Sequence, residues 1–251
     1  MIPPKRNIND AGYSSGMTIF TAGENFHEFE HGLGREPELV TLVVDLGNGY
    51  HCDGLGSMST LPNVKGTQYS WGGVIYGYNE SHVRIWAPSK NGGALFSVQD
   101  GWGVQSNSFD VSYSGAFQVK VWSKVTNTHV KRFIVGRNDK GQEVDLPVTA
   151  DIDNDLVFMT VKAIDGNNKG FSFPASGAVQ NAHDRGEYGG VVYSYSTNKL
   201  RYWLPPLKQT NVNGPQGRLI YINDEYGGGH FQQGSLSAEL AIHVWKSNTT
   251  C

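Results

Sequence analysis

Charged residues are scarce in this chain. Of its 251 residues only 17% are Asp, Glu, Lys or Arg, and the 20 basic and 23 acidic side chains give a net charge of −3. This balance lacks the basic field that attracts a phosphate backbone, which argues against nucleic acid as a partner. Long apolar runs are also missing. None approaches the roughly 20 residues that a membrane-spanning helix needs, so we expect no membrane insertion.

Cysteine is the next scarce residue. Cys52 and Cys251 are too few for a disulfide framework and are not spaced as a metal-binding knuckle, and the sequence leaves open whether they pair with each other or with another chain. The first residues lack the apolar core of a signal peptide. They fit an intracellular protein as well as a mature chain without its leader, and we expect the extracellular location.

Sequence motifs of catalysis are missing too. No GxSxG nucleophile elbow, phosphate loop or dinucleotide fingerprint occurs in the sequence. His27 and His31 lie four residues apart and His51 lies near Asp53, but nothing places a third metal ligand. We therefore expect a protein that is not an enzyme, with no catalytic residues, no bound metal and no cofactor.

One acidic segment, residues 151–155, resembles the start of a calcium loop. Its three aspartates alternate along the chain, but Leu156 follows where the helix–loop–helix motif needs Gly, and Lys162 stands in place of the bidentate Glu. That motif is therefore absent. A looser calcium site at the end of a strand is left open.

Glycine and aromatic residues, by contrast, are abundant. The chain has 32 glycines and 12% aromatic residues, with few of the Ala, Leu, Glu and Lys stretches that build helices. Short apolar or alternating runs predict strands at residues 39–44, 73–78, 82–86, 94–98, 116–122, 156–161, 190–195, 199–204, 218–222 and 240–245. The sequence therefore predicts an all-β protein.

The chain also repeats itself. Residues 72–78 and 83–88 return as 189–195 and 200–205, both at the same offset of 117 residues. Later segments return as well, with a longer offset that indicates an insertion within 208–215 of the second copy: 95–103 returns as 219–227, and 121–123 returns as 244–246. Doubled modules raise avidity without any new contact, which favours a bivalent binding or building protein over an enzyme with one site.

This repetition predicts two tandem antiparallel β-sandwich domains from an internal duplication. We expect an N-terminal arm at residues 1–16, a first repeat at 17–125 and a second repeat at 126–251. Each repeat is long enough to bury a core of its own. Five or six short strands with close turns fit a sandwich, in which two sheets bury one face each against the other.

Alternation along the repeated hairpins predicts which side chains share a face. Arg84 and Trp86 lie on one face of their strand, while Val83 and Ile85 lie on the other. Two tyrosine pairs also share a face at a spacing of two, and we expect at least one of them to be buried: Tyr76 with Tyr78, and Tyr193 with Tyr195.

The best candidate for a ligand site is the loop that follows the fourth strand of each copy. The first loop carries Asp100 and Trp102, and the second carries Asp224, Tyr226 and His230. A flat ring offers an apolar surface to the C–H face of a sugar, and a carboxylate accepts hydrogen bonds from paired hydroxyls. The same residues also fit a turn without a ligand, in which Asp bonds its own backbone, Gly supplies a positive φ and the ring packs at the sandwich edge.

Two segments of the first copy resemble a known family. Residues 26–40, with the sequence FHEFEHGLGREPELV, resemble the opening of H-type lectin domains and of related receptor-binding domains on phage fibres, and residues 117–122 are similar to the last strand of such domains. The Tyr-rich hairpin is similar to repeats in secreted invertebrate proteins of unassigned role. The lectin resemblance implies an antiparallel sandwich, a galactose or N-acetylgalactosamine ligand and an oligomer. It rests on framework strands, so it assigns no sugar contact to a residue.

We therefore expect a non-catalytic, lectin-like protein whose two units bind glycans or glycoproteins. The alternative is a self-assembling structural or extracellular matrix protein without a ligand pocket, in which the strands, the exposed tyrosines and the arm make contacts between copies. An exposed tyrosine stripe without a concave pocket favours assembly, whereas a shallow cleft beside Asp100 and Trp102 favours sugar binding.

Overall fold

Strands account for the regular secondary structure in the part of the chain that the structure describes. The computed structural model describes residues 12–20, 25–47, 49–54, 71–89, 93–97, 111–125, 127–136, 139–175, 188–205, 217–222, 226–229 and 234–247. This part of the chain forms the strands β1 to β21 and no α-helix, which confirms the predicted all-β class. Accordingly, the described residues contain no helix of the length and hydrophobicity that a membrane crossing requires.

The first antiparallel sheet is built on two long apolar strands of the N-terminal half. Its order is β1 (Tyr13–Ser14), β12 (Ala116–Trp122), β4 (Leu39–Asp45) and β5 (His51–Asp53), and β2 (Thr18–Ile19) also pairs with β12. Burial alternates along β4 and β12, as the period of two predicts, and one face is buried: Val40, Leu42, Val44, Phe117, Val119 and Val121. β1 belongs to the segment predicted as an arm, and in the structure it is an edge strand of this sheet.

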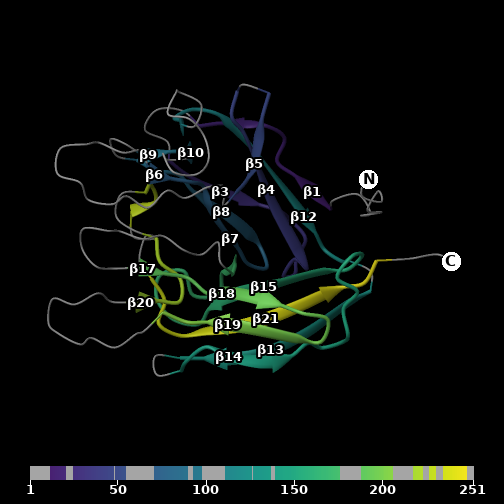
Figure 1. Ribbon diagram of the computed structural model, residues 1–251. Helices are drawn as coiled ribbons and strands as arrows, with labels where there is room; N and C mark the ends of the chain where they lie inside the picture. The colour runs from purple at the N-terminus through teal and green to yellow at the C-terminus, as the bar shows by residue number, and fades with distance from the viewer. Residues whose placement is uncertain are drawn as a thin grey trace, which may run out of the picture.

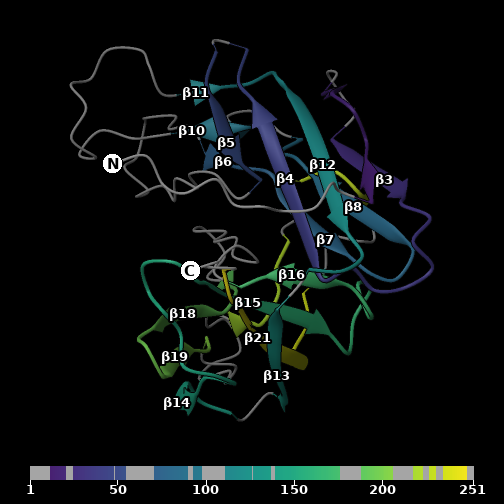
Figure 2. The ribbon, with the colours of Figure 1, turned by 90° about the vertical axis from the view of Figure 1, so that its right-hand side faces the viewer.

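The second sheet has seven strands drawn from both halves of the chain. Its order is β13 (Thr128–Val135), β21 (Ala238–Trp245), β15 (Leu156–Ala163), β16 (Ser172–Pro174), β7 (Ile75–Tyr78), β8 (His82–Trp86) and β3 (Phe26–Glu30). The halves join where Ser172 of β16 pairs with Tyr78 of β7, and Figure 2 shows these strands side by side. The predicted boundary after residue 125 falls between β12 and β13, but hydrogen-bonded pairing crosses from one half to the other.

The third sheet belongs to the second half and lies nearest the viewer in Figure 1, in front of β21 and β15. It has the order β14 (Gln142–Asp145), β19 (Lys199–Trp203) and β18 (Val192–Tyr195). Three further pairs are small: β10 (Phe96–Ser97) with β11 (Val111–Ser112), β6 (Trp71–Gly72) with β9 (Gly93–Ala94), and β17 (Tyr188–Gly189) with β20 (Gly217–Arg218). The last two of these pairs are parallel.

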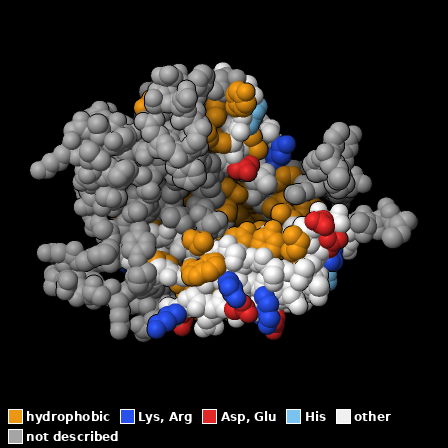
Figure 3. All heavy atoms as spheres, viewed as in Figure 1, with side chains coloured by type: hydrophobic (Ala, Val, Ile, Leu, Met, Phe, Trp, Pro, Cys, Tyr) orange, Lys and Arg blue, Asp and Glu red, His pale blue; other side chains and the backbone are white. Residues whose placement is uncertain are grey.

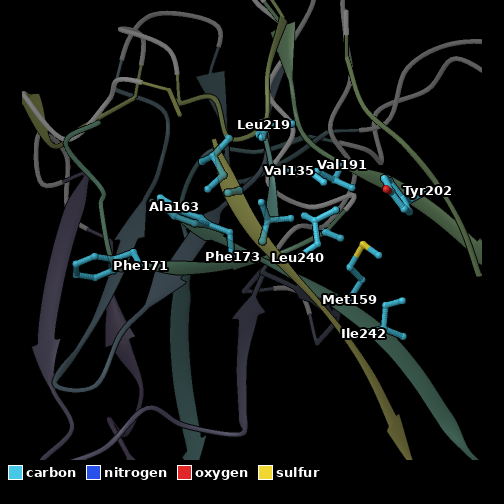
Figure 4. Packing of buried hydrophobic residues seen from close by; sticks show 14 of the residues in the cluster. Val135, Met159, Ala163, Phe171, Phe173, Val191, Tyr202, Leu219, Leu240 and Ile242 are labelled. Carbon is cyan, nitrogen blue, oxygen red and sulfur yellow. The ribbon is translucent and has the colours of Figure 1, made fainter. Parts of the chain in front are cut away.

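Two hydrophobic clusters fill the spaces between the sheets. The first lies between the first sheet and β7–β8, and includes Tyr76, Tyr78, Val83 and Ile85. The second lies between the β13–β21–β15–β16 part of the seven-stranded sheet and the third sheet. Figure 4 shows it, with side chains such as Phe173, Leu240, Met159, Val191 and Leu219 packed together.

The β7–β8 hairpin contributes to both clusters. Val83 and Ile85 belong to the first cluster, while Ile75 and Trp86 belong to the second. The alternation predicted for this strand is confirmed, with Arg84 on the Trp86 side, where its guanidinium lies over the ring of Phe171. Because both of its faces are covered, every residue of β7 is buried. Burial of the Tyr76 and Tyr78 pair, at 8% and 4% exposure, is confirmed as well.

Strand pairing follows the same order in both halves. The run β1–β12–β4–β5 has a counterpart in β13–β21–β15–β16, and β3–β8–β7 has one in β14–β19–β18. The registers agree too, since Leu39 pairs with Trp122 as Leu156 pairs with Trp245. The parallel pairs correspond as well, since β6–β9 in the first half has its counterpart in β17–β20 in the second half.

Candidate functional site

Most of the predicted loop residues lie outside the described part of the chain. These are Asp100, Trp102, Asp224 and His230. Tyr226 is described, and its ring is only 1% exposed within the second cluster, where its backbone forms a bridge with Pro88. The structure therefore places Tyr226 in the core, and the ring surface that we expected to stack on a sugar is covered by protein.

A groove lined by aromatic rings lies where the two halves of the chain meet. This central groove has a volume of about 260 Å³, and its rings are Tyr76 and Tyr78 of β7, Phe158 of β15 and Tyr193 of β18. The exposed residue Asp53, at the end of β5, adds a carboxylate. In Figure 3 hydrophobic side chains gather between the upper and lower parts of the molecule.

Internal contacts fix the tyrosines of the central groove. The hydroxyl of Tyr76 donates a 3.0 Å hydrogen bond to the carbonyl of Val40. Burial raises the pKa of Tyr76, and the nearby carboxylate of Asp53 raises it further. Burial also raises the pKa of Tyr78. Both side chains therefore stay neutral at physiological pH. Because they are only 8% and 4% exposed, the more accessible rings of the central groove are those of Phe158 and Tyr193.

A second groove lies on the face of the seven-stranded sheet opposite the second cluster. This polar groove has a volume of about 280 Å³ and carries charged side chains of both signs: Glu36, Glu38, Arg132, Lys162 and Glu239. His243 of β21 also lines it. Alternation explains the arrangement, because β15, β16 and β21 turn their apolar side chains toward the second cluster and their polar side chains toward this groove.

Ion pairs hold the walls of the polar groove. Lys162 Nζ lies 2.6 Å from Glu36 Oε2, and the hydroxyl of Ser172 donates a 2.8 Å hydrogen bond to the same carboxylate. Arg132 Nε lies 3.6 Å from Glu239 Oε1, and the arginine side chain is 56% exposed. A guanidinium has five N–H donors, so this single contact leaves Arg132 with donors for a ligand.

His243 is a buried polar side chain with one nitrogen unused. It is 6% exposed, its ring stacks on Phe158 at 4.5 Å, and its Nε2 lies 3.1 Å from Thr160 Oγ1. Its Nδ1 is buried without a hydrogen-bond partner among the described residues. Burial, followed by the charge of Arg132, lowers the pKa of His243 to about 4. The ring is therefore neutral at pH 7, and an unpaired buried nitrogen costs free energy.

The two grooves are neighbours. Tyr78 and Thr160 line both of them, and Phe158 of the central groove stacks on His243 of the polar groove. Together they form a surface with aromatic rings at one end and, at the other, hydrogen-bonding side chains of positive and negative charge. Such a surface suits a ligand that has both C–H faces and hydroxyl groups.

The acidic segment at 151–155 is held by internal contacts. Asp155 accepts hydrogen bonds from the backbone N–H groups of Asp151 and Ser247, and Lys246 Nζ lies 2.6 Å from its carboxylate. An ammonium therefore sits where a calcium ion would bind this carboxylate. No cluster of three or more metal-ligating side chains occurs in the part of the chain that the structure describes.

Comparisons with known proteins add no relative. The chain matches no protein-family model, no curated protein and no solved structure. The likeness to H-type lectin domains thus stays an expectation from the sequence.

Sequence reasoning singled out three tyrosines of the central groove, Tyr76, Tyr78 and Tyr193, but missed the charged residues of the polar groove. Glu36 stands beside Pro37 in a segment used only for its family resemblance, and Arg132 belongs to β13, a strand that was not predicted. One signal was present: His243 interrupts an apolar run in β21, and a lone polar residue in such a run marks a position that needs a partner.

Proposed function

We propose that this protein is a non-catalytic glycan-binding protein whose ligand lies across the central and polar grooves. The observation that carries the proposal is the meeting of these grooves at Tyr78 and Thr160, beside the unused Nδ1 of His243. Aromatic rings would contact the C–H faces of the sugar rings. Arg132, the groove carboxylates and His243 would bind the hydroxyl groups.

We also propose that the halves of the chain descend from an internal duplication. The constant offset of the repeated hairpin and the matching pairing orders of the two halves support this origin. The loops at Asp100 with Trp102, and at Asp224 with His230, remain candidates for further sugar contacts. An extracellular location fits a glycan ligand.

A glycan-array screen of the full-length protein tests the proposal. We expect selective binding that survives a calcium chelator. His243→Phe keeps the ring that stacks on Phe158 but removes both nitrogens, and Arg132→Met removes the guanidinium. Each change should weaken binding about tenfold or more, the effect of losing a hydrogen bond of roughly 1.5–3 kcal/mol to a charged or buried group.

Two controls make the result specific. Lys140→Met removes an exposed cation outside both grooves and should leave binding unchanged. The double variant Asp100→Ala with Trp102→Ala separates the sites: unchanged binding assigns the ligand to the grooves, and lost binding assigns it to the loop. An array without any selective signal, or equal binding by His243→Phe and the unaltered protein, would contradict the proposed groove site.

A further inference from the structure

The outer face of the third sheet is exposed and partly apolar. Val192 and Trp203, which pair with each other across β18 and β19, are each 49% exposed. Arg201 lies on the same face and forms an ion pair with Glu143 across the β14–β19 pair, at 2.6 Å. We call the face formed by Glu143, Val192, Ser194, Arg201 and Trp203 the open face.

The corresponding face in the first half of the chain is covered. At the repeat offset of 117, the hairpin residues of the open face correspond to Ile75, Gly77, Arg84 and Trp86. Ile75 and Trp86 are fully buried. Glu28 pairs with Arg84 in the same strand register as Glu143 with Arg201, and it forms the same ion pair. Two matching faces therefore differ in one respect: the first has a partner within the chain.

That partner is the start of β16 in the second half, residues Phe171, Ser172 and Phe173, which we call the internal corner. The ring of Phe171 lies under the guanidinium of Arg84 at 3.9 Å, and Phe173 stacks on Trp86 at 5.7 Å. Ser172 between them pairs with Tyr78 at the edge of β7. The internal corner thus extends the sheet at the edge of β7 and covers the face of the hairpin with two aromatic rings.

The first half has a segment that corresponds to the internal corner, and the aromatic ring of this segment, that of Tyr50, faces solvent. Asp45 pairs with His51 as Lys162 pairs with Ser172, so Tyr50 corresponds to Phe171 and Cys52 to Phe173. Tyr50 is 73% exposed. We call residues Tyr50, His51 and Cys52 the corner.

Side-chain sizes match between the corner and the open face. In the internal contact Phe173 packs directly on Gly77, where an added Cβ would lie 2.6 Å from the phenyl ring. At the matching positions the open face has Ser194, which is larger than Gly, and the corner has Cys52, which is smaller than Phe. The larger residue on one side is thus offset by the smaller one on the other, as close packing requires.

Strand edges also match. β18 pairs with β19 along one edge and β5 pairs with β4 along one edge, and within the described residues the other edge of each strand pairs with no strand. The internal pairing of Ser172 with Tyr78 corresponds to a pairing of His51 with Tyr195. A strand edge that continues into a second molecule is a common mode of protein association.

We propose that a second copy of this chain binds with its corner on the open face, so that copies join head to tail in the way that the two halves join within one chain. Tyr50 would lie under Arg201 of the neighbouring copy, and Cys52 would face Ser194. The contact is heterologous, so it leaves one corner and one open face free and continues into a ring or a filament. The inference rests on the duplication proposed above and is independent of the glycan ligand.

Sedimentation of the full-length protein tests this contact. Between about 1 μM and about 1 mM, the range of weak to moderate protein affinities, the average mass should rise with concentration. Tyr50→Glu in the corner and Val192→Asp on the open face should each keep the protein at the mass of one chain. Ile134→Asp changes an apolar side chain that is 70% exposed outside both surfaces, and this control should assemble normally.

Mixing the two variants gives the decisive measurement. An equal mixture still holds one intact corner and one intact open face, so it should form pairs of chains and nothing longer. Recovery of pairs also shows that both variants are folded. The proposal is overturned if the unaltered protein stays at one chain, if either single variant assembles normally, or if the mixture does not form pairs.

A disulfide provides a second readout. In a Cys251→Ser background, Ser194→Cys would place a thiol opposite Cys52 of the next copy, and oxidation should then give covalently linked chains. Replacing Cys52 by Ser in the same protein should abolish the link. Equal linking without Cys52 would overturn the proposed register.

Discussion

At the scale of single residues, His243 is a side chain whose proton binding is altered by its surroundings. Its ring is stacked on Phe158 and 6% exposed, and burial with the charge of Arg132 lowers its pKa to about 4, while Glu36 acts in the opposite direction. The folded protein therefore holds this ring neutral under conditions where an unfolded chain, with a His pKa near 6.5, would begin to bind a proton.

This difference predicts a pH dependence of stability. Above about pH 6.5 the ring is neutral in both the folded and the unfolded state. Between about pH 6.5 and 4 the unfolded state binds more protons than the folded state, so the free energy of unfolding falls as the pH falls. The total loss is roughly 3 kcal/mol. Urea unfolding across this range should show the fall in the unaltered protein and a smaller fall in His243→Phe. Parallel pH profiles of the two proteins would contradict the prediction.

The candidate site shows where residue-level reading of a sequence succeeds and where it stops. The alternation that placed Arg84 with Trp86 is local, and the structure has it. Tyr226 satisfied every local criterion for a ligand-binding ring. In the structure its ring is buried in the second cluster, and its backbone bridges to Pro88, which is 138 positions earlier in the chain. The pairing of Arg132 and Glu36 around one groove likewise depends on strands distant in sequence.

At the scale of elements, β7 packs between two cores, and Gly77 makes this possible. A Cβ at Gly77 would meet the ring of Phe173 at 2.6 Å, so Gly77→Val should destabilise the protein by about 1–3 kcal/mol through overpacking. The matched change Ser194→Val falls on exposed β18 and should cost less than about 0.5 kcal/mol. Adding Phe173→Leu to Gly77→Val should recover part of the loss, because the two side chains compete for one space. Equal costs at positions 77 and 194, measured by urea unfolding, would contradict this account.

Strands with strong apolar alternation were predictable, and short or charged ones were not. β4, β8, β12, β15 and β21 were predicted within two residues of their observed ends. By contrast, β13 (THVKRFIV) and β14 (QEVD) were missed. Two adjacent charged residues, Lys131 and Arg132, interrupt the alternation of β13, and β14 is short with Glu143 and Asp145 exposed. β16 is only three residues long, and its pairing with β7 leaves no periodic trace in the sequence.

At the scale of the whole molecule, the shared sheet couples the two halves. Ile75 and Trp86 from the first half are fully buried in the second cluster, so unfolding either half would expose core surface of the other.

We therefore predict one cooperative unfolding transition for the full chain. Ile85→Ala in the first cluster and Ile242→Ala in the second should each cost about 2–5 kcal/mol and should shift that single transition. Tryptophan fluorescence and circular dichroism should give the same midpoint for each variant, because a two-state transition looks alike to both probes. Two separate transitions, each moved by one of the substitutions alone, would show instead that the halves are stable independently.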